Sequence, residues 1–381
     1  MATTYSSAQS SQVATFARSG SNLVQTRWLG SLGHVMNLQY SFNYPGGCDK
    51  LSLLLEVEPT FRTDAMNPGR VVQVFRGGGI VWDGILDEPQ PGTGGWTVTA
   101  VGTGNQGTNV RAFYTSTWPS GEPDQAINNA ISRGLRWTNP GVGQPTGSWF
   151  GQAVDPGDQT ISDLLNLVCA RGGYAWYVNS QPSGGNVLSV SLLPTAPQYL
   201  LVDTTPVGRT LGGNWNTLFL RYQISADNAT TGAPAVYGTV SVTNQSSVTL
   251  YGPMEQYVDL SNAGTMTATQ AQAVGNYILA VYQRVTFTGP FVIQPGQLLT
   301  LGGQPVDLGC VQAGVVVQLV LTDYGYGGEV NPQFPISFIV GTYEWNDQTQ
   351  QATITPYQTL NQNIQALLSL EGTLLTPITA G

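Results

Sequence analysis

Hydrophobic and polar residues alternate along residues 69–102, in the pattern of strands that bury one face. The alternating hydrophobic positions form three runs: Val72 and Val74, then Ile80, Trp82 and Leu86, then Trp96, Val98 and Ala100. Glycine and proline residues separate the runs, as they do at turns between strands. The pattern predicts a three-stranded meander.

Three consecutive glycines, Gly77, Gly78 and Gly79, stand between the first two runs. A phosphate-binding glycine loop joins a strand to a helix, whereas these glycines join two predicted strands. Glycine accepts the positive φ that tight hairpins require. We therefore predict a hairpin turn here and no phosphate site.

Two segments between residues 119 and 198 have hydrophobic residues at helical spacing. The first lies between Pro123 and Gly134, and the second begins at Thr160, with Asp163 placed to complete a capping box. The strands "YAWYV" and "VLSVSLL" follow. These elements predict a small unit of two helices and a hairpin.

A third helix is predicted from Thr267, with Gln270 as its capping-box partner, to Arg284. A weaker pattern places a fourth helix at 359–370. The remaining segments, 199–260 and 285–358, have the short alternating runs of strands.

Residues 285–358 repeat features of the first meander. The segments "GRVVQV" from Gly69, "WDGILDEP" and "WTVTAVG" correspond in order to "GVVVQL" from Gly314, "FIVGTYEW" and "ATITPY". Gly84 and Val98 are 14 residues apart, and Gly341 and Ile354 are 13 apart. The repeat indicates two related β modules, and chance similarity between β-rich segments is the alternative explanation.

We therefore predict a mainly β (α+β) chain with two tube-like β-barrel modules and a small helix-plus-hairpin domain between them. The predicted parts are an N-terminal arm at 1–22, a first barrel at 23–118 with 199–240, the insert at 119–198, a second barrel at 241–358 with the helix at 267–284, and a C-terminal tail at 359–381. The polar arm is expected to order only against a neighbouring subunit.

Charge is scarce along this chain of 381 residues. Charged residues make up 9% of the sequence, against about 25% in ordinary soluble domains. Lys50 is the single lysine, and the net charge is −9. Broad binding of nucleic acid through phosphate contacts is therefore not expected.

Cys48, Cys169 and Cys310 are far apart and form neither a zinc motif nor an even disulfide framework, so we expect reduced and mostly buried thiols. The first twenty residues lack the basic and apolar regions of a signal peptide, and the longest apolar run is too short to span a bilayer as a helix. A soluble chain made in the cytosol is expected.

Catalytic motifs are missing from the sequence. The only histidine, His34, lies in an alternating strand pattern and is expected to be structural rather than a catalytic base. Asp203 and Thr204 begin a segment like the turn of aspartic proteases, but Thr205 and Pro206 replace its glycine. No catalytic, metal-binding or cofactor-binding residue is predicted, and the chain is not expected to be an enzyme.

One constellation keeps a glycan-binding or glycan-cleaving alternative open. Asp83, Asp87 and Glu88 lie near Trp82, and carboxylates beside an aromatic ring suit a sugar cleft. The simpler interpretation is a strand edge whose polar residues face water.

Three groups of segments carry a resemblance to a known family. They are "VVQVFRGGGIVWDGILDEP" with "WTVTAVG", "TISDLLNLVCARGGYAWYV" with "VLSVSLL", and "YGPMEQYVDLSNAGTMTATQAQAVGNYIL" with "GQPVDLGCVQAGVVVQLVL", which together span about 71 to 321. In this order they resemble the tail hub, or baseplate hub, minor tail protein of long-tailed bacteriophages.

The resemblance implies a structural virion component that forms a homotrimer, so that six similar barrels surround one channel. It implies a distal tail or tail tube protein above, fibre or spike proteins below, and tape-measure protein and DNA as passengers in the channel. It also implies a place at the virion tail tip after assembly in the host cytoplasm, without stable membrane association. A hexameric distal tail ring protein, with one tube-like module per chain, is a further alternative.

Overall fold

The computed structural model describes residues 10–19, 22–58, 64–111, 136–138, 160–172, 174–180, 186–202, 209–210, 215–226, 231–261, 265–282, 286–287, 290–320 and 337–357. The helices predicted at 123–134 and 359–370 and the C-terminal tail lie outside these residues. Strands dominate the described elements, so the mainly β prediction is confirmed. The closure of each module into a barrel stays a prediction.

Antiparallel strands between residues 12 and 102 form what we call the first ladder. Its hydrogen-bonded order is β2 (Asn22–Trp28), β1 (Gln12–Ser19), β5 (Val71–Arg76), β6 (Gly79–Leu86), β8 (Gly95–Gly102), β4 (Gly46–Glu56) and β3 (His34–Asn43), with β7 (Gln90–Gly92) beside β8. The predicted meander is confirmed as β5, β6 and β8. Gly77 and Gly78 form its first turn with φ of 59° and 81°.

The N-terminal arm predicted at 1–22 is wrong for residues 12–19, which form β1. This strand pairs with β2 on one side and β5 on the other. Val13, Ala14 and Thr15 are buried there. Many small and polar residues in this segment favour a disordered arm. However, β-branched Val13 and Thr15 favour a strand, and here the strand has a neighbour on each side.

The insert extends the first ladder. Its strands β9 (Trp137–Thr138), β11 (Asn186–Leu192) and β10 (Tyr174–Ser180) pair in that order, and β10 pairs in parallel with β4. Helix α2 (Ile161–Gly172) packs against β10. The predicted capping box is confirmed, because the Thr160 N–H donates to Asp163 Oδ2 and the Asp163 N–H donates to Thr160 Oγ1, both at 3.2 Å.

The second ladder has the order β19 (Leu298–Thr300), β12 (Tyr199–Val202), β20 (Val316–Val320), β21 (Ser337–Asn346), β22 (Gln351–Pro356) and β18 (Phe291–Ile293). We predicted residues 199–240 in the first barrel, but β12 pairs with β19 and β20 instead. Short strands β13 (Arg209–Thr210) and β17 (Thr286–Phe287) pair with each other. The described residues also form four 3₁₀ turns, η1 (Leu29–Ser31), η2 (Asp64–Met66), η3 (Thr103–Asn109) and η5 (Leu308–Cys310).

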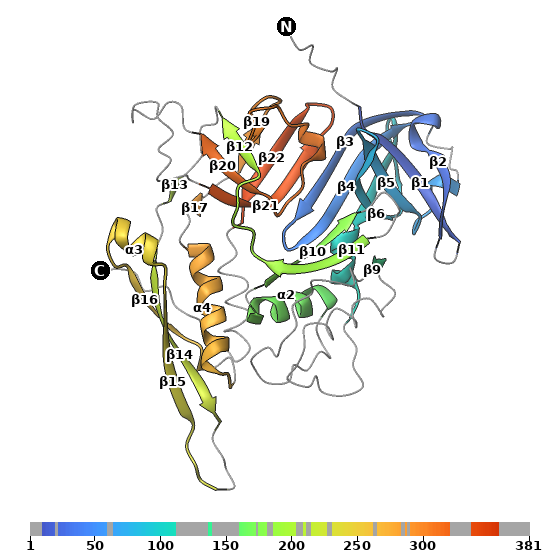
Figure 1. Cartoon of the computed structure of the whole chain (residues 1–381). Helices are drawn as coiled ribbons and strands as arrows, with labels where there is room; N and C mark the ends of the chain where they lie inside the picture. The colour runs from blue at the N-terminus through green and yellow to red at the C-terminus, as the bar shows by residue number, and fades with distance from the viewer. Residues whose placement is uncertain are drawn as a thin grey trace.

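A third layer consists of the sheet β15 (Val236–Thr243), β14 (Thr217–Ser225) and β16 (Glu255–Asp259), covered on one face by α4 (Ala268–Tyr282). The hairpin β14–β15 extends away from both ladders (Figure 1). The capping box predicted for α4 is confirmed, because the Thr267 N–H donates to Gln270 Oε1 at 2.7 Å and the Gln270 N–H donates to Thr267 Oγ1 at 3.3 Å.

Helix α3 (Gln245–Tyr251) lies where we predicted strands. Asn244 caps it by accepting a hydrogen bond from the Ser247 N–H at 3.2 Å, and Gly252 ends it with φ of 77°. The local cap and stop signals were present in the sequence, but the helix is shorter than the window in which periodicity is visible.

Candidate assembly surface

Strand β21 joins the two ladders. Its residues Thr342–Asn346 pair with Gln39–Asn43 of β3 in antiparallel register, while its opposite edge pairs with β22. The strands β18, β22, β21, β3, β4 and β8 therefore form one continuous sheet. The orange and blue parts of the chain meet along this line (Figure 1).

One face of this continuous sheet is polar, and we call it the polar sheet face. Most of its side chains are polar and exposed or half-buried: Gln39, Ser41, Asn43, Lys50, Ser52, Thr97, Thr99, Thr342, Glu344, Asn346, Gln351, Thr353 and Thr355. By register, half-buried Leu54 and Val101 and exposed Val292 share this face. Intervening residues such as Tyr40, Leu53, Val98, Tyr343 and Ile354 are buried on the other face. This alternation follows from the two-residue period of a strand.

Matched registers align the polar side chains into rows that cross the joint. One row runs through Gln351, Asn346, Gln39, Ser52 and Thr99. A hollow of about 560 Å³ lies over this part of the sheet. Hydroxyl and amide groups dominate it, so the surface offers many weak hydrogen bonds and little net charge.

Arg76 at the end of β5 ties the two ladders together by its side chain. Its Nε donates to both carboxylate oxygens of Asp307, at 2.9 and 2.8 Å, and its Nη1 donates to Asp347 Oδ1 at 2.7 Å. The guanidinium also lies 5.0 Å from the centre of the Trp345 ring, and Nη2 donates to Gln350 Oε1 at 3.2 Å. We call these five residues together with Ser11 the Arg76 cluster.

The Arg76 side chain is only 2% exposed, so its charge depends on these partners. Burial lowers the pKa of Arg76, but hydrogen bonds and charge from Asp307, with a further contribution from Asp347, raise it above its ordinary value overall. A charge this deeply buried is stable only where its donors are satisfied. The guanidinium therefore stays charged and fixes the ladders against each other.

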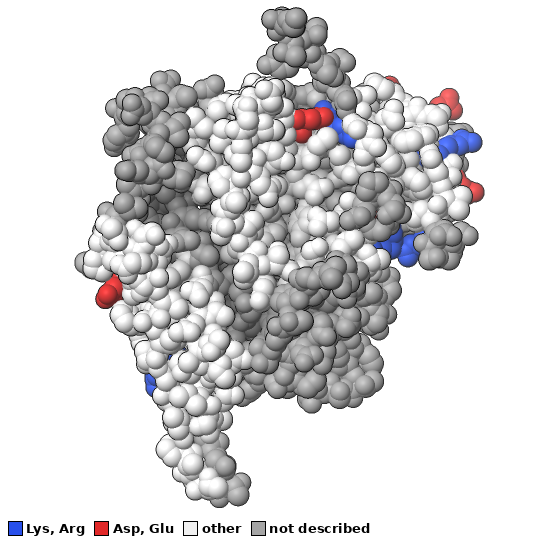
Figure 2. All heavy atoms as spheres, viewed as in Figure 1, with Lys and Arg blue, Asp and Glu red and all other residues white. Residues whose placement is uncertain are grey.

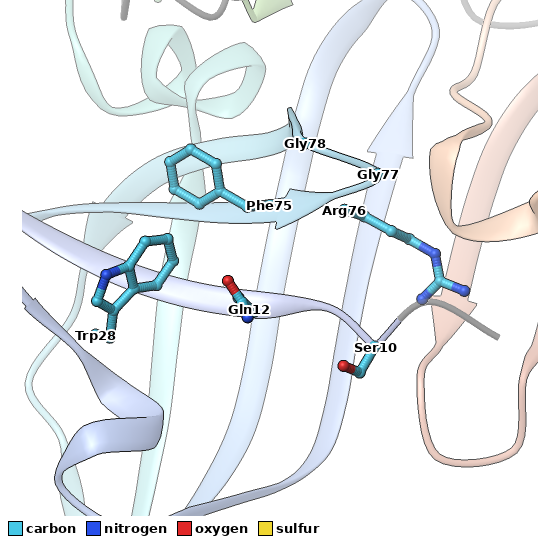
Figure 3. A pocket seen from close by; sticks show the side chains of 7 residues that line it. All are labelled: Ser10, Gln12, Trp28, Phe75, Arg76, Gly77 and Gly78. Carbon is cyan, nitrogen blue, oxygen red and sulfur yellow. The ribbon is translucent and has the colours of Figure 1, made fainter. Parts of the chain in front are cut away.

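An open pocket of about 450 Å³ adjoins the Arg76 cluster. It is lined by Trp28 and Phe75, whose ring centres are 5.2 Å apart, and by the Gly77–Gly78 turn. Ser10, just before β1, and Gln12, the first residue of β1, also line it. Figure 3 shows the two aromatic rings together on one side, while the Arg76 side chain points away from them. The pocket is thus a shallow aromatic recess beside the joint.

The four residues named for the glycan alternative do not come together around an opening. Trp82 is fully buried and its Nε1 donates to the Ser41 carbonyl at 3.1 Å, while Asp87 and Glu88 are exposed. Asp83 is 1% exposed. These four residues therefore do not line a common cleft, as the glycan alternative required, and Asp83 also departs from the simpler interpretation because it does not face water.

Asp83 instead holds the first ladder to the insert. Its carboxylate accepts two hydrogen bonds from Arg136, at 2.8 and 3.2 Å, and one each from Gln73 and Thr103, both at 2.7 Å. Asn186 of β11 donates a further bond at 3.3 Å. With its acceptor positions occupied, this carboxylate is structural.

The remaining titratable candidates, His34 and the three cysteines, do not gather into a site. His34 begins β3 and lies exposed beside Glu56, with Nδ1 and Oε2 3.6 Å apart. All three cysteines are free, with Cys48 and Cys169 buried and Cys310 exposed. Burial raises the pKa of the Cys48 and Cys169 thiols, as expected for unreactive core residues.

Within the described ranges, no cluster of His, Cys, Asp or Glu is arranged to hold a metal ion. No described helix has the length and apolar character needed to cross a membrane. On the face drawn in Figure 2, the described residues are largely uncharged, and the few charged side chains appear at separate points, most of them toward the right.

Comparison with known proteins gives matches by structure. No family model matches the chain, and no curated protein matches it by sequence. Among solved structures, the 43 kDa tail protein of prophage MuSo2 from Shewanella oneidensis is 14% identical, with a TM-score of 0.53 over 92% of this chain and 98% of that one. A tail protein from Neisseria meningitidis is 11% identical, with a TM-score of 0.53 over 91% and 95%. The chain has the fold of phage tail proteins.

A third structure extends this fold likeness. Prophage tail protein gp18 from Listeria monocytogenes is 10% identical, with a TM-score of 0.53 over 94% of this chain and 98% of that one. The resemblance to phage tail proteins that the sequence indicated is thus confirmed for the fold.

Sequence reasoning missed the Arg76 cluster, although one signal was present. Arg76 follows Val72 and Val74 at strand spacing, so its parity places it on a buried face. A charged residue on a buried face requires a partner. The sequence did not indicate that Asp307 and Asp347 are those partners.

Proposed function

We propose that the chain is a structural hub of a bacteriophage tail tip, in which three copies form a ring with pseudo-sixfold symmetry. The ring would join the tail tube to fibre or receptor-binding proteins and line the channel for DNA and tape-measure protein. The site of action would be the virion tail tip, after assembly in the host cytoplasm. The role is structural rather than enzymatic.

The continuous sheet through β21 and β3 carries the proposal. It places two ladders of one chain side by side with a shared polar face. Three copies then supply six ladders, which matches a sixfold tube to a threefold tip. The fold of the phage tail proteins compared above supports this interpretation.

Chemistry of the polar sheet face supports its assignment to the channel. Among its polar side chains, Lys50 and Glu344 are charged and the others are hydroxyl or amide groups, while Asp87 adds a carboxylate at the hollow over this face. Phosphate binding draws on Lys and Arg contacts, so this face would let a polyanion pass without holding it.

The mass of the assembled protein under native conditions tests the proposal. We expect three copies per ring, and images of tail particles should place the polar sheet face toward the bore. Six copies per ring would favour the distal tail ring protein. A monomer that hydrolyses cell-wall glycan would overturn the structural role.

A further inference from the structure

Ser11, the residue just before β1, completes the hydrogen-bond network of the Arg76 cluster. Ser11 Oγ donates to Asp347 Oδ1 at 2.7 Å and accepts from Arg76 Nη1 at 3.1 Å. Arg76 Nη1 in turn donates to the same Asp347 oxygen. The three polar groups therefore form a closed triangle.

Each corner of the triangle belongs to a different part of the chain. Arg76 comes from the first ladder, Asp347 from the turn between β21 and β22 of the second, and Ser11 from the segment leading into β1. Asp347 also binds the first ladder directly, because its N–H donates to the Leu38 carbonyl at 2.9 Å. The trio lies where the ladders meet.

Close packing makes this arrangement sensitive to small displacements. A Cβ placed on Gly309 would lie 2.5 Å from Arg76 Cδ, so the arginine stem has no room on that side. Trp345, whose ring faces the guanidinium, also donates from Nε1 to Asp347 Oδ1 at 3.2 Å. In a buried polar network, the loss of one member weakens the others.

We propose that the segment Ser10–Gln12 acts as a latch, because the position of Ser11 determines how rigidly the two ladders are held at their joint. With Ser11 seated, the Arg76–Asp347 pair is held in one geometry and the ladders behave as one body. When the segment is drawn away, the directly bonded pair loses its third partner and the joint loosens. A contact that seats or displaces the start of β1 thereby changes the stiffness of the joint between the two ladders.

The test compares Ser11→Ala with Ser10→Ala in the full chain. The two serines are neighbours, but Ser10 is exposed and lines the aromatic pocket rather than the triangle. We expect Ser11→Ala to raise amide hydrogen exchange about fivefold in 307–310 and 342–351, the change that loss of a net hydrogen bond of about 1 kcal/mol gives. Exchange in β14–β16 should not change, and Ser10→Ala should match the wild type throughout.

A second background separates the latch from general destabilisation. In an Asp347→Asn chain the triangle is already altered, so adding Ser11→Ala should have little further effect on the same amides. Equal exchange in Ser10→Ala and Ser11→Ala would overturn the proposal, and so would a uniform rise that includes β14–β16. The measurement uses the isolated chain, so its outcome does not depend on whether three copies form a hub.

Discussion

At the scale of single residues, the buried charge of the described residues is concentrated at two points, in a chain that has little charge. Arg76 joins the ladders and Asp83 joins the first ladder to the insert, and the carboxylate or guanidinium in each case has several partners. Such groups add little net stability over apolar residues of the same shape, but removing one partner leaves the other unpaired. Each is therefore a sensitive position.

Replacing Asp83 with alanine should lower the free energy of unfolding by about 3–5 kcal/mol, because Arg136 is left as an uncompensated and mostly buried charge. Denaturant unfolding of the full chain measures the change. Glu344→Ala removes an exposed carboxylate from the polar sheet face and should stay within about 0.5 kcal/mol of the wild type. Equal losses in the two variants would contradict the structural role of Asp83.

Thiol reactivity gives a second prediction. Partial burial of the Cys310 thiol, together with the nearby Asp307 carboxylate, raises the pKa of Cys310 to about 11. Burial raises the pKa of Cys48 to about 12. The thiolate is the reactive form, so at pH 8 iodoacetamide should modify exposed Cys310 slowly, and faster as the pH rises toward 11. Mass spectrometry of the native chain should find Cys48 and Cys169 unmodified at pH 8; their reaction at the rate of Cys310 would refute the buried placement.

At the scale of elements, edge strand β15 stands out by composition. Its sequence, Val236–Thr243, contains neither a charged residue nor proline, and within the described part of the chain it pairs with β14 alone. Natural edge strands usually carry a charge or proline that discourages pairing with other chains. Exposed Val236 and Tyr237 add an apolar surface at the same edge.

Ser241→Lys should therefore reduce self-association of the isolated chain at high concentration, because it places a charge on the exposed face at this edge. Light scattering as a function of concentration measures the effect. Gln272→Lys on the exposed side of α4 changes the net charge equally and serves as the control. If both lysines act alike, net charge and not the edge of β15 is responsible.

Elements defined by neighbouring residues were predictable, and those defined by distant partners were not. The capping boxes at Thr160 and Thr267 and the turn at Gly77 follow from local chemistry, and all are present. The pairing of β12 with β20, and of β21 with β3, has no local signature, because any strand of matching alternation satisfies the same pattern. The polar sheet face depends on that pairing, so it could not be predicted from the sequence.

At the scale of the whole molecule, the two segments of the predicted repeat differ at the position of Arg76, which holds the ladders together. Arg76 lies seven residues after Gly69, and the residue seven after Gly314 in the second repeat is Leu321. The arginine therefore serves the joint within a chain and has no counterpart in the repeat. In the proposed ring, joints within and between chains would differ in chemistry, which favours threefold over strict sixfold order.

Charge on the polar sheet face tests the channel assignment at this scale. If the proposed hub is correct, Ser52→Lys combined with Thr353→Lys should leave assembly intact and slow DNA release, because lysines near passing phosphates retain them. Release kinetics from purified particles measure this. Gln245→Lys with Gln272→Lys, on α3 and α4, adds the same charge elsewhere. Unchanged release in the first variant would remove this face from the channel.

The double pairing of β21 also limits how the sequence can change over evolutionary time. A one-residue insertion in β21 would exchange its buried and outward side chains for the rest of the strand. Because β22 and β3 both take their register from it, the error would spread into both ladders. Homologous chains should therefore vary in length at connecting segments, while the ten residues of Ser337–Asn346 keep an unchanged count.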